Sequence, residues 1–417
     1  MNKLKLLDLF TGIGGFHLAG KRNGNIETIC TSETDPFNIK FIDQNMGLDN
    51  AGDISSVAVP LANHPHVHFM EKDLIAVEET GFSTLSIEDF YEGVLDFPDI
   101  ISGGFPCQDI SSANLFGNNA GINGDRSGLV VELLRIIESL EPKYCVMENS
   151  DKLPKRGLDF ILAEFARMGY IVEFETVAAC HFGFNHYRHR TYLAAYLPNS
   201  AVALSNKRIF DMVRRRANKK PNQRLPLVHE ADVAFKNFAT VLDTRSVKLR
   251  TKRINSLGNA IIPDIAEAIF DAITRAELNV DKHYASLKLR KSEPYYASLI
   301  DESWCIEQQD LFGSDNGSVE MPTRGIMVDG RLYSGSVDRK LNPMKNQYSG
   351  MFSTLIRKDG NNNFTTRSRL NRPGKLGGLV GDIMRLGADK GGLNPEFCEV
   401  FMGYEKGYTQ LKSDMDR

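Results

Sequence analysis

Residues 4–15 read LKLLDLFTGIGG, and this stretch decides the fold class of the chain. An apolar run that ends in a glycine-rich turn is typical of a buried parallel strand that leads into a loop. Gly12, Gly14 and Gly15 allow the loop backbone to approach a bound molecule closely. A plain tight turn and a nucleotide site of another kind are alternative interpretations, because the glycines lack the GxGxxG spacing of a dinucleotide fold.

Alternating strand and helix patterns continue to about residue 200. Apolar strand patterns recur at 27–33, 97–104, 143–150, 170–179 and 191–197, and helical spacing occurs at 128–140 and 159–170. This alternation predicts an α/β fold with a doubly wound parallel sheet. Because ligands bind at the carboxyl ends of strands in such sheets, we expect functional residues in 8–15, at Glu33, in 104–108 and in 148–150.

The composition changes after residue 200. Residues 205–253 are polar and basic, and 253–273 (RINSLGNAIIPDIAEAIFDAI) predict a Gly-Asn turn followed by an apolar helix with Pro263 in its first turn. From about residue 280 the chain is rich in Gly, Asn, Ser, Arg and Tyr and has few long apolar runs. We expect a second domain of loops and short strands there.

The net charge of −3 conceals a segregation of charge along the chain. Residues 1–204 carry 15 basic and 27 acidic side chains, whereas 205–255 carry 14 basic and 4 acidic, and 324–375 carry 11 basic and 3 acidic. Two basic segments on an acidic body favour a polyanionic partner that binds one face, with nucleic acid as the first candidate. A solvated surface rich in Lys and Arg is the alternative.

Length and composition restrict the class of protein. With 417 residues and 42% hydrophobic residues, the chain has the length of two or three domains and the composition of a globular protein. It has no run of 18 apolar residues, so no transmembrane helix is expected, and MNKLKLLDLF predicts a strand rather than a signal peptide. The six cysteines include no CxxC pair, which argues against a metal site or a disulfide framework and for a reducing, cytoplasmic setting.

Cys107 lies in GGFPCQDIS (103–111), a predicted loop at a strand end, and is a candidate nucleophile. A thiol with a pKa near 8.5 is mostly protonated at neutral pH, so a site must activate it. The alternative is a buried structural cysteine, which we expect for Cys30, Cys145 and Cys180 within strand-like runs.

Glu148 in MENS (147–150) is a candidate acid, because a carboxyl group at a strand end could protonate a heterocycle or bind it by a hydrogen bond. The alternative is that this stretch serves as a helix N-cap through Asn149, Ser150 or Asp151. Both can hold, with Asn149 and Ser150 structural and Glu148 functional.

Arg188 and Arg190 in HYRHR (186–190) enter a predicted strand two residues apart and so point to the same side. There they could bind a phosphate or the edge of a base. A solvated pair at the strand entrance is the alternative.

The order of these motifs resembles one family closely. DLFTGIGG, SETDPF, GDIS, GGFPCQDIS, GDRSGL, ENS, RHR and SLGNAIIP are similar to the ordered blocks of the bacterial and phage DNA cytosine-5 methyltransferases, over about residues 4–270. The chain departs from that pattern at Ser150, where the family usually has Val, and at His186, where it usually has Gln. The segment between Asp53 and Pro106 is also longer than usual.

The resemblance implies a Rossmann-like, S-adenosylmethionine-dependent methyltransferase fold and a role for each matching residue. Cys107 would be the nucleophile on cytosine C6, Glu148 would contact N3 and the exocyclic amine, and Arg190, with Arg188, would hold the base oxygen and a neighbouring phosphate. The residues expected to bind S-adenosylmethionine are Phe10, Thr11, Gly12, Ile13, Gly14, Gly15, Glu33, Asp53, Ile54, Pro106, Asn259 and Ala260. Glu33 would contact the ribose and Asp53 the adenine, with Asp73 as a rival for the adenine contact.

DNA contacts are expected from Gln108, Ser111 and Arg126, and from Arg367 and Arg369 in the Arg- and Asn-rich stretch 358–372. Arg pairs well with guanine edges and Asn with adenine edges. A solvated loop is the alternative for the last two arginines. We expect a catalytic domain at 1–275 with a basic insert at 200–253, a target-recognition domain at 280–390, and a C-terminal segment, 391–417, that packs back on the catalytic domain. The segment 197–253 is the rival place for recognition.

The predicted function is methyl transfer from S-adenosylmethionine to C5 of a flipped-out cytosine in a specific duplex DNA sequence. A transfer-RNA cytosine-5 methyltransferase and a DNA-binding protein with a decayed catalytic site are alternatives. A dinucleotide oxidoreductase is disfavoured by the missing GxGxxG and by the PCQ loop. We expect a monomer in the cytoplasm of a bacterial or phage-infected cell, with duplex DNA as partner, no membrane or metal, and a cognate restriction endonuclease as a candidate partner.

Overall fold

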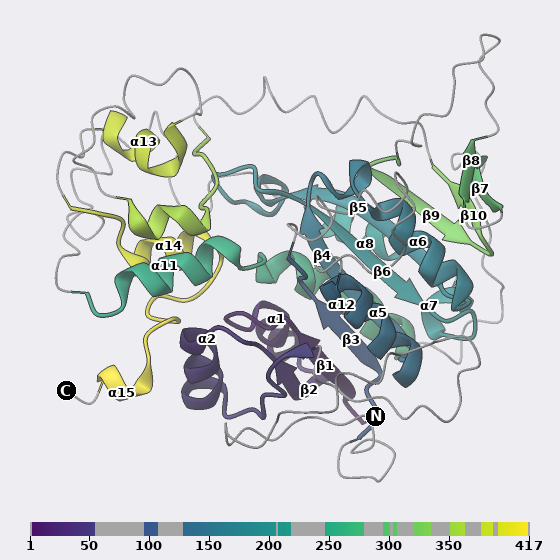
Figure 1. Ribbon diagram of the computed structural model, residues 1–417, viewed down its shortest axis with the longest axis horizontal. Coiled ribbons are helices and arrows are strands. Elements are labelled where there is room, and N and C mark those ends of the chain that lie inside the picture. Colours follow the sequence, from purple (N-terminus) through teal and green to yellow (C-terminus); the bar gives the residue numbers. More distant parts are fainter. Residues whose placement is uncertain are drawn as a thin grey trace.

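The structure is a computed structural model that describes residues 2–54, 96–106, 128–205, 207–217, 247–278, 295–300, 303–306, 321–334, 351–362, 377–386 and 391–415. In these ranges the chain forms a ten-stranded sheet in the order β2-β1-β3-β4-β6-β5-β9-β10-β7-β8 (Figure 1). The strands are β1 (Leu4–Leu9), β2 (Ile26–Ser32), β3 (Ile100–Gly103), β4 (Tyr144–Ser150), β5 (Ile171–Ala178), β6 (His189–Tyr196), β7 (Tyr295–Ile300), β8 (Ser303–Ile306), β9 (Arg324–Val328) and β10 (Arg331–Tyr333).

Helices connect and cover these strands. The α-helices are α1 (Gly15–Asn23), α2 (Pro36–Phe41), α5 (Gly128–Leu140), α6 (Leu158–Arg167), α7 (Ala201–Leu204), α8 (Ile209–Ala217), α11 (Arg250–Asn259), α12 (Pro263–Glu277), α13 (Gly378–Arg385), α14 (Pro395–Phe401) and α15 (Lys412–Met415). Shorter helical turns are η1 (Ile42–Met46), η4 (Leu153–Lys155), η5 (Ala179–Phe182) and η9 (Arg357–Asn361). None of the described helices has both the length and the apolar character needed to cross a membrane.

The sheet separates two hydrophobic cores, because successive strand residues point to opposite faces. Leu6, Ile100 and Val146 belong to the core on one face, with the buried residues of α1 and α12. Leu7 and Ile101 belong to the core on the other face, with those of α5 and α6. Helices on both faces of a largely buried sheet make an α/β fold, as the strand-helix alternation predicts.

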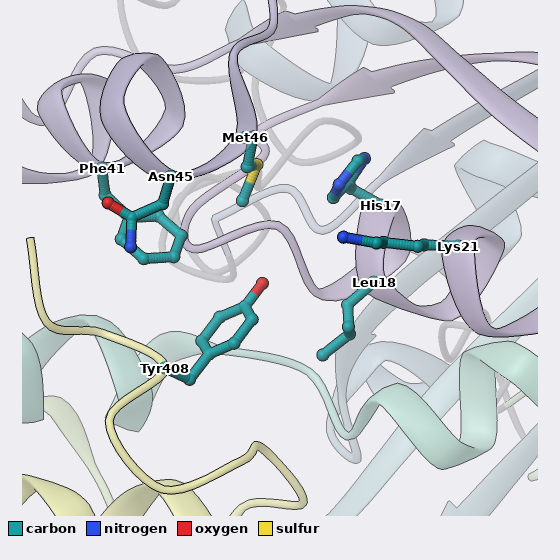
Figure 2. A pocket seen from close by; sticks show the side chains of 7 residues that line it. All are labelled: His17, Leu18, Lys21, Phe41, Asn45, Met46 and Tyr408. Atoms are coloured by element: carbon teal, nitrogen blue, oxygen red, sulfur yellow. The ribbon is translucent and has the colours of Figure 1, made fainter. Parts of the chain in front are cut away.

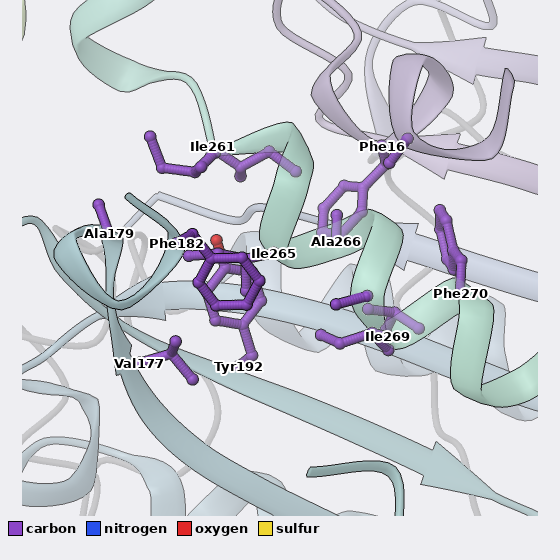
Figure 3. Packing of buried hydrophobic residues seen from close by; sticks show 14 of the residues in the cluster. Phe16, Val177, Ala179, Phe182, Tyr192, Ile261, Ile265, Ala266, Ile269 and Phe270 are labelled. Atoms are coloured by element: carbon purple, nitrogen blue, oxygen red, sulfur yellow. The ribbon is translucent and has the colours of Figure 1, made fainter. Parts of the chain in front are cut away.

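Helix α12 is the central element of the first core. Pro263 begins the helix, where a missing backbone N–H costs nothing. Its apolar residues recur at helical spacing, and Ala266, Ile269 and Phe270 point toward the sheet and α1 in Figure 3. The rings of Phe16 in α1 and Phe270 lie 6.2 Å apart between centroids. This packing fixes α1, and with it the glycine loop that precedes α1.

Only three of the nine strand pairings in the described sheet are parallel. β1 pairs in parallel with β2 and β3, and β3 pairs in parallel with β4, whereas β6 is antiparallel to both β4 and β5. The expected parallel orientation of 191–197 is therefore wrong. The physical reason is the connection: ten residues separate β5 from β6, and a parallel crossover needs a dozen or more.

The predicted Gly-Asn turn before α12 is also different in the structure. Gly258 and Asn259 are the last two residues of α11, and the turn follows them. A methyl group on Gly258 would overlap the backbone of Ile356 and Arg357. Glycine is used there because two backbones approach closely, not because the chain must turn.

Residues after 280 continue the sheet. β9 pairs with β5, and β10, β7 and β8 follow it in antiparallel order. Trp304 of β8 is buried and donates through Nε1 to the carbonyl of Asp159 in α6 (2.9 Å). At the other side of the view in Figure 1, α13 and α14 lie with α11. The described parts of 280–390 thus contact elements of 1–275 directly, and the domain division near residue 280 stays a prediction.

Candidate active site

The glycine loop leaves β1 at the carboxyl edge of the parallel strands. Thr11 fixes its start: Thr11 N donates to Ser32 O (3.0 Å), and Thr11 Oγ1 donates to Asp8 O (2.6 Å). Phe10, Gly12 and Gly14 all have positive φ angles, of 55°, 58° and 71°. A methyl group on Gly12 would meet none of the described residues within 4 Å, so these residues leave the space over the loop open.

Glu33 follows β2 and faces this loop. Its Oε2 accepts from Gly12 N (2.7 Å), and its Oε1 accepts from Thr34 N and Asp35 N (both 2.8 Å). A carboxylate oxygen accepts up to two hydrogen bonds, so Oε2 can still accept one from a ligand hydroxyl. Gly12 and Glu33, which the sequence predicts as residues of one site, are therefore in direct contact.

Asp53 and Ile54 lie at the same edge. The chain that leads to them runs beside the end of β2, where Ala51 N donates to Thr31 O (2.7 Å) and Ser32 Oγ donates to Gly52 O (2.7 Å). Asp53 is exposed and Ile54 is buried. An exposed carboxylate thus follows directly on the residue bonded to Ser32. Asp73, the rival candidate, lies outside the described residues.

Asp8 is a buried carboxyl group beneath the glycine loop. Its Oδ1 accepts from Ser102 Oγ (2.7 Å), and its Oδ2 has no hydrogen-bond partner among the described residues. Burial raises the pKa of Asp8 to about 7, although Ser102 and the backbone of His17 favour the charged form. A carboxyl group without a full set of donors in a dry site holds its proton.

Glu148 lies at the same edge of the sheet, near the carboxyl end of β4. Its side chain is 9% exposed, and its Oε1 lies 3.0 Å from Arg190 Nε of the neighbouring strand β6. Burial raises the pKa of Glu148, opposed by the positive charges of Arg190 and Arg188. The site therefore has a carboxyl group that binds a proton more tightly than an exposed Glu does, and a cation that orients it.

The loop that precedes Cys107 passes over Glu148. A methyl group on Gly104 would lie 3.6 Å from Glu148 Oε2. Asn149 Nδ2 donates to the carbonyl of Phe105 (3.0 Å), and Asn149 Oδ1 accepts from Ser150 N (2.7 Å). Asn149 therefore holds this loop, and the interpretation of Asn149 as a helix N-cap is wrong, since Gly157 precedes α6.

Arg188 has a different environment from Arg190. It is 2% exposed, and its guanidinium donates to three backbone carbonyls: Leu355 O (3.0 Å), Gly258 O (3.2 Å) and Ala260 O. A guanidinium used in this way connects three segments and is turned away from solvent. The solvated-pair alternative is excluded for both arginines.

Residues 259–261, at the end of α11 and directly after it, form a third part of the site. Asn259 is exposed, and the carbonyl of Ala260 is held by Arg188. Ile261 fills the space that Gly15 leaves, and it lies 3.9 Å from the position of a methyl group on Gly104. The structure thus joins the glycine loop, the Gly104 loop and 259–261, and Ile261 is a contact that the motif pattern did not indicate.

The C-terminal segment contacts the glycine loop and the segment 259–261. Tyr408 Oη donates to Ile13 O (2.9 Å), and Tyr404 Oη donates to Ile261 O (3.1 Å). Figure 2 shows Tyr408 across a small pocket from α1; the pocket is lined by His17, Leu18, Lys21, Phe41, Asn45, Met46 and Tyr408. Neither tyrosine is singled out by the sequence, because each acts on a residue more than 140 positions away.

Part of the positive charge of the basic segment 205–255 is neutralised by acidic side chains of the same chain. Arg214 forms ion pairs with Glu175 and Asp211, and Arg216 forms ion pairs with Glu267 and Asp271. These arginines of α8 cannot be counted as free cations for a polyanion. Arg214 and Arg216 therefore add little net positive charge to the surface that would bind a polyanion.

Several predicted site residues lie outside the described residues: Cys107, Gln108, Ser111, Arg126, Arg367 and Arg369. Pro106, the last described residue before Cys107, is exposed. Cys30, Cys145 and Cys180 are buried, as expected. Within the described ranges no group of three or more His, Cys, Asp or Glu side chains could hold a metal ion.

Comparisons with known proteins agree on one family. A model of the C-5 cytosine-specific DNA methylase family matches residues 4–237, more than half of the chain. Similar curated proteins include the Type II methyltransferases M.Sau3AI of Staphylococcus aureus (29% identical over 47% of this chain and 44% of that one), M2.BsuMI of Bacillus subtilis (30%, over 46% and 42%) and M1.ScrFI of Lactococcus lactis subsp. cremoris (31%, over 50% and 45%). The match thus spans less than half the length of these relatives.

Proposed function

This chain belongs to the C-5 cytosine-specific DNA methylase family, and from that membership we propose that it methylates C5 of cytosine in duplex DNA. One observation carries the proposal. The buried Glu148 carboxyl is oriented by Arg190 and lies against the Gly104 loop that leads to Cys107. Attack on a heterocycle requires a nucleophile and an acid, and Glu148 supplies the acid beside the loop that leads in sequence to Cys107.

Cys107 is the nucleophile in this proposal. Its thiolate forms a bond to cytosine C6. The π electron pair of the C5–C6 double bond shifts toward C5 and N3, which makes C5 nucleophilic. Glu148 donates a proton or a strong hydrogen bond at N3 and so stabilises the charge that develops there. After C5 gains the methyl group, C5 loses its proton to water, and the electron pair of that C–H bond reforms the C5–C6 double bond as the thiolate leaves. N3 then returns its proton to Glu148.

S-adenosylmethionine, when bound, would supply an electrophilic methyl group. The hydrogen-bond acceptors at the ends of β1 and β2 fit this molecule. Glu33 Oε2 has capacity for a ribose hydroxyl, Asp53 is an exposed acceptor for an adenine amine, and no described residue fills the space over Gly12. We assign the cofactor contacts to Phe10–Gly15, Glu33, Asp53, Ile54 and Pro106, with Asn259 and Ala260 on the opposite side.

The two arginines have separate roles in the proposal. Arg190, with its side chain 21% exposed, orients Glu148 and holds the oxygen of the base. Arg188 is a positioning residue, because its guanidinium is already bonded to the carbonyls of Leu355, Gly258 and Ala260. This replaces the expectation that Arg188 itself binds a phosphate.

Duplex DNA is the proposed substrate, and a cognate restriction endonuclease is a proposed partner. The target base must leave the base stack to reach Glu148, which lies 9% exposed at the strand edge. We place recognition in 280–390, with Arg367 and Arg369 as base-reading candidates and Gln108, Ser111 and Arg126 as further DNA contacts. The catalytic domain (1–275) and the C-terminal segment (391–417) complete the proposed organisation.

The test is bisulfite sequencing of DNA from cells that express the protein, together with in vitro methyl transfer to duplex DNA and to tRNA. Methylated cytosines at one recurring DNA sequence are the expected result. A duplex with 5-fluorocytosine at that site should form a covalent complex with the wild type and none with Cys107→Ala. Methylation of tRNA alone would contradict the proposed substrate, and turnover by Cys107→Ala would contradict the mechanism.

A further inference from the structure

The turn formed by residues 355–362 presents three consecutive exposed side chains beside the candidate active site, and Asn361 is a fourth exposed residue of the turn. Ile356, Arg357 and Lys358 are consecutive and exposed, and Ile356 retains 43% of its accessible surface. The acidic residue of the turn, Asp359, is 1% exposed. The exposed surface formed by 356–358 is therefore apolar and cationic.

The turn is held in one conformation by Asp359. Its Oδ2 accepts from Ile356 N (3.0 Å), its Oδ1 accepts from Asn362 Nδ2 (3.3 Å), and its backbone N donates to Ile356 O (2.9 Å). A surface that is ordered before binding loses less conformational entropy when a partner binds.

Two glycines let the turn lie directly on α11. A methyl group on Gly258 would overlap the backbone of Ile356 and Arg357, and one on Gly360 would lie 2.7 Å from Thr251 O. Arg250 Nη2 and Thr251 Oγ1 both donate to Gly360 O (3.1 and 3.2 Å). The turn and the helix thus form one rigid unit.

Arg188 connects this unit to the catalytic residues. It donates to the carbonyl of Leu355, the residue before Ile356, and to that of Gly258. Its charge also acts on the carboxyl of Glu148. The position of Ile356 is therefore fixed relative to the place where the target base is expected.

We propose that the 355–362 turn contacts the DNA duplex, with Ile356 inserted into the base stack next to the target cytosine and Arg357 and Lys358 on the adjacent phosphates. The inference rests on the proposed function and assigns it a contact surface. A flipped base leaves a gap in the stack, and an apolar side chain that enters the stack can offset the loss of stacking. Cations beside the wedge release counterions from the phosphates.

Ile356 is tested by base flipping. With 2-aminopurine in place of the target cytosine in a duplex, wild-type binding should raise the fluorescence as the base leaves the stack. Ile356→Ala should lose most of that rise, while Ile356→Leu should restore it and S-adenosylmethionine affinity should stay the same. Ile300→Ala is the control, because Ile300 is 55% exposed in β7, at the far end of the sheet.

The two cations are tested by the salt dependence of DNA binding. Arg357→Ala and Lys358→Ala should each weaken binding to cognate and unrelated duplexes alike, and each should reduce the slope of log Kd against log salt by about one. Lys3→Ala is the control, since Lys3 precedes β1 at the opposite edge of the sheet from the site.

Unchanged salt slopes in the arginine and lysine variants, or full fluorescence in Ile356→Ala, would overturn the inference. Neither measurement needs turnover. If the wild type binds duplex DNA but transfers no methyl group, the proposed function fails, while the slopes and the fluorescence still decide whether this turn contacts DNA.

Discussion

Glu148 and Asp8 are carboxyl groups at the ends of β4 and β1, and burial raises the pKa of both. The same physical cause leads to different consequences, because only Glu148 has an arginine beside it and only Glu148 lies against the Gly104 loop. Single-residue predictions follow from this difference and from the contact that Asn149 makes with the loop.

Glu148→Gln should reduce kcat by about 10²-fold or more, because the amide keeps the shape but cannot donate a proton at N3. In the wild type, a raised pKa keeps the acid form present to higher pH than in an ordinary Glu. The rate should therefore fall as pH rises through that pKa. A pH profile of kcat measures this, and a Gln variant with wild-type turnover would leave Glu148 without a chemical role.

Asp8→Asn should remove a pH dependence of stability. Because the folded state holds the Asp8 proton up to about pH 7 and the unfolded state loses it near pH 4, wild-type stability falls as pH rises between these values. The loss is at most about 4 kcal/mol, at about 1.4 kcal/mol per pKa unit. Urea unfolding at pH 5 and pH 7.5 measures it, and an equal pH slope in the Asn variant would show that Asp8 is ionised in the fold.

Asn149→Asp isolates one hydrogen bond. Aspartate can still accept from Ser150 N, but it cannot donate to Phe105 O. Loss of that donor costs on the order of 1–3 kcal/mol, so kcat should fall by about 10-fold or more, and S-adenosylmethionine affinity should not change. Single-turnover methyl transfer is the measurement. Wild-type rates in both Asn149→Asp and Asn149→Ala would mean that the Gly104 loop is held by other contacts.

At the scale of the elements, local patterns in the sequence predict strands and helices well. The strand that ends in the glycine loop, the helix 128–140 and the strand that ends at Ser150 all appear in the structure. The direction of β6 could not be read from its residues, because the alternation of side chains is the same in parallel and antiparallel strands. The roles of Asn149 and Gly258 could not be predicted from the sequence either, since their partners lie 44 and about 100 positions away.

Arg253 and Glu399 connect α11 with α14 by a buried ion pair. Their side chains are 5% and 0% exposed, with a distance of 2.8 Å. Glu399→Ala should destabilise the fold by about 3–5 kcal/mol, because it leaves a buried charge without its partner, whereas Arg253→Met with Glu399→Leu should recover much of this. Arg167→Ala is the control, since its pair with Glu138 is half-exposed and contributes about 1 kcal/mol or less. Equal losses of folding stability in Glu399→Ala and Arg167→Ala would contradict the buried-pair assignment.

At the scale of the whole molecule, segments far apart in the chain share one site. The C-terminal segment bonds to the glycine loop and to Ile261, and β9 joins the sheet beside β5. Motif order identifies the family and most of the residues that meet at the strand edge. It does not indicate Tyr404 or Tyr408, because nothing local in the sequence marks a hydroxyl that bonds to a distant carbonyl.

Tyr408→Phe should weaken S-adenosylmethionine binding by about 5- to 10-fold, since one hydrogen bond of roughly 1 kcal/mol holds the carbonyl of Ile13. DNA affinity and kcat at saturation should stay the same. Tyr170→Phe is a matched control, because Tyr170 Oη makes the same kind of bond to Pro142 O (2.7 Å) away from the strand edge. Calorimetric titration measures the affinity, and equal cofactor affinity in the two variants would limit Tyr408 to packing.

The bond between Tyr408 and Ile13 joins positions 395 residues apart. During translation the glycine loop is made before the residue that holds it, because 395 positions separate Ile13 from Tyr408. A nascent chain that stops before residue 408 has all of the motifs by which the family is identified, yet its glycine loop lacks this contact. The order of synthesis therefore leaves the glycine loop without this contact until Tyr408 has emerged from the ribosome.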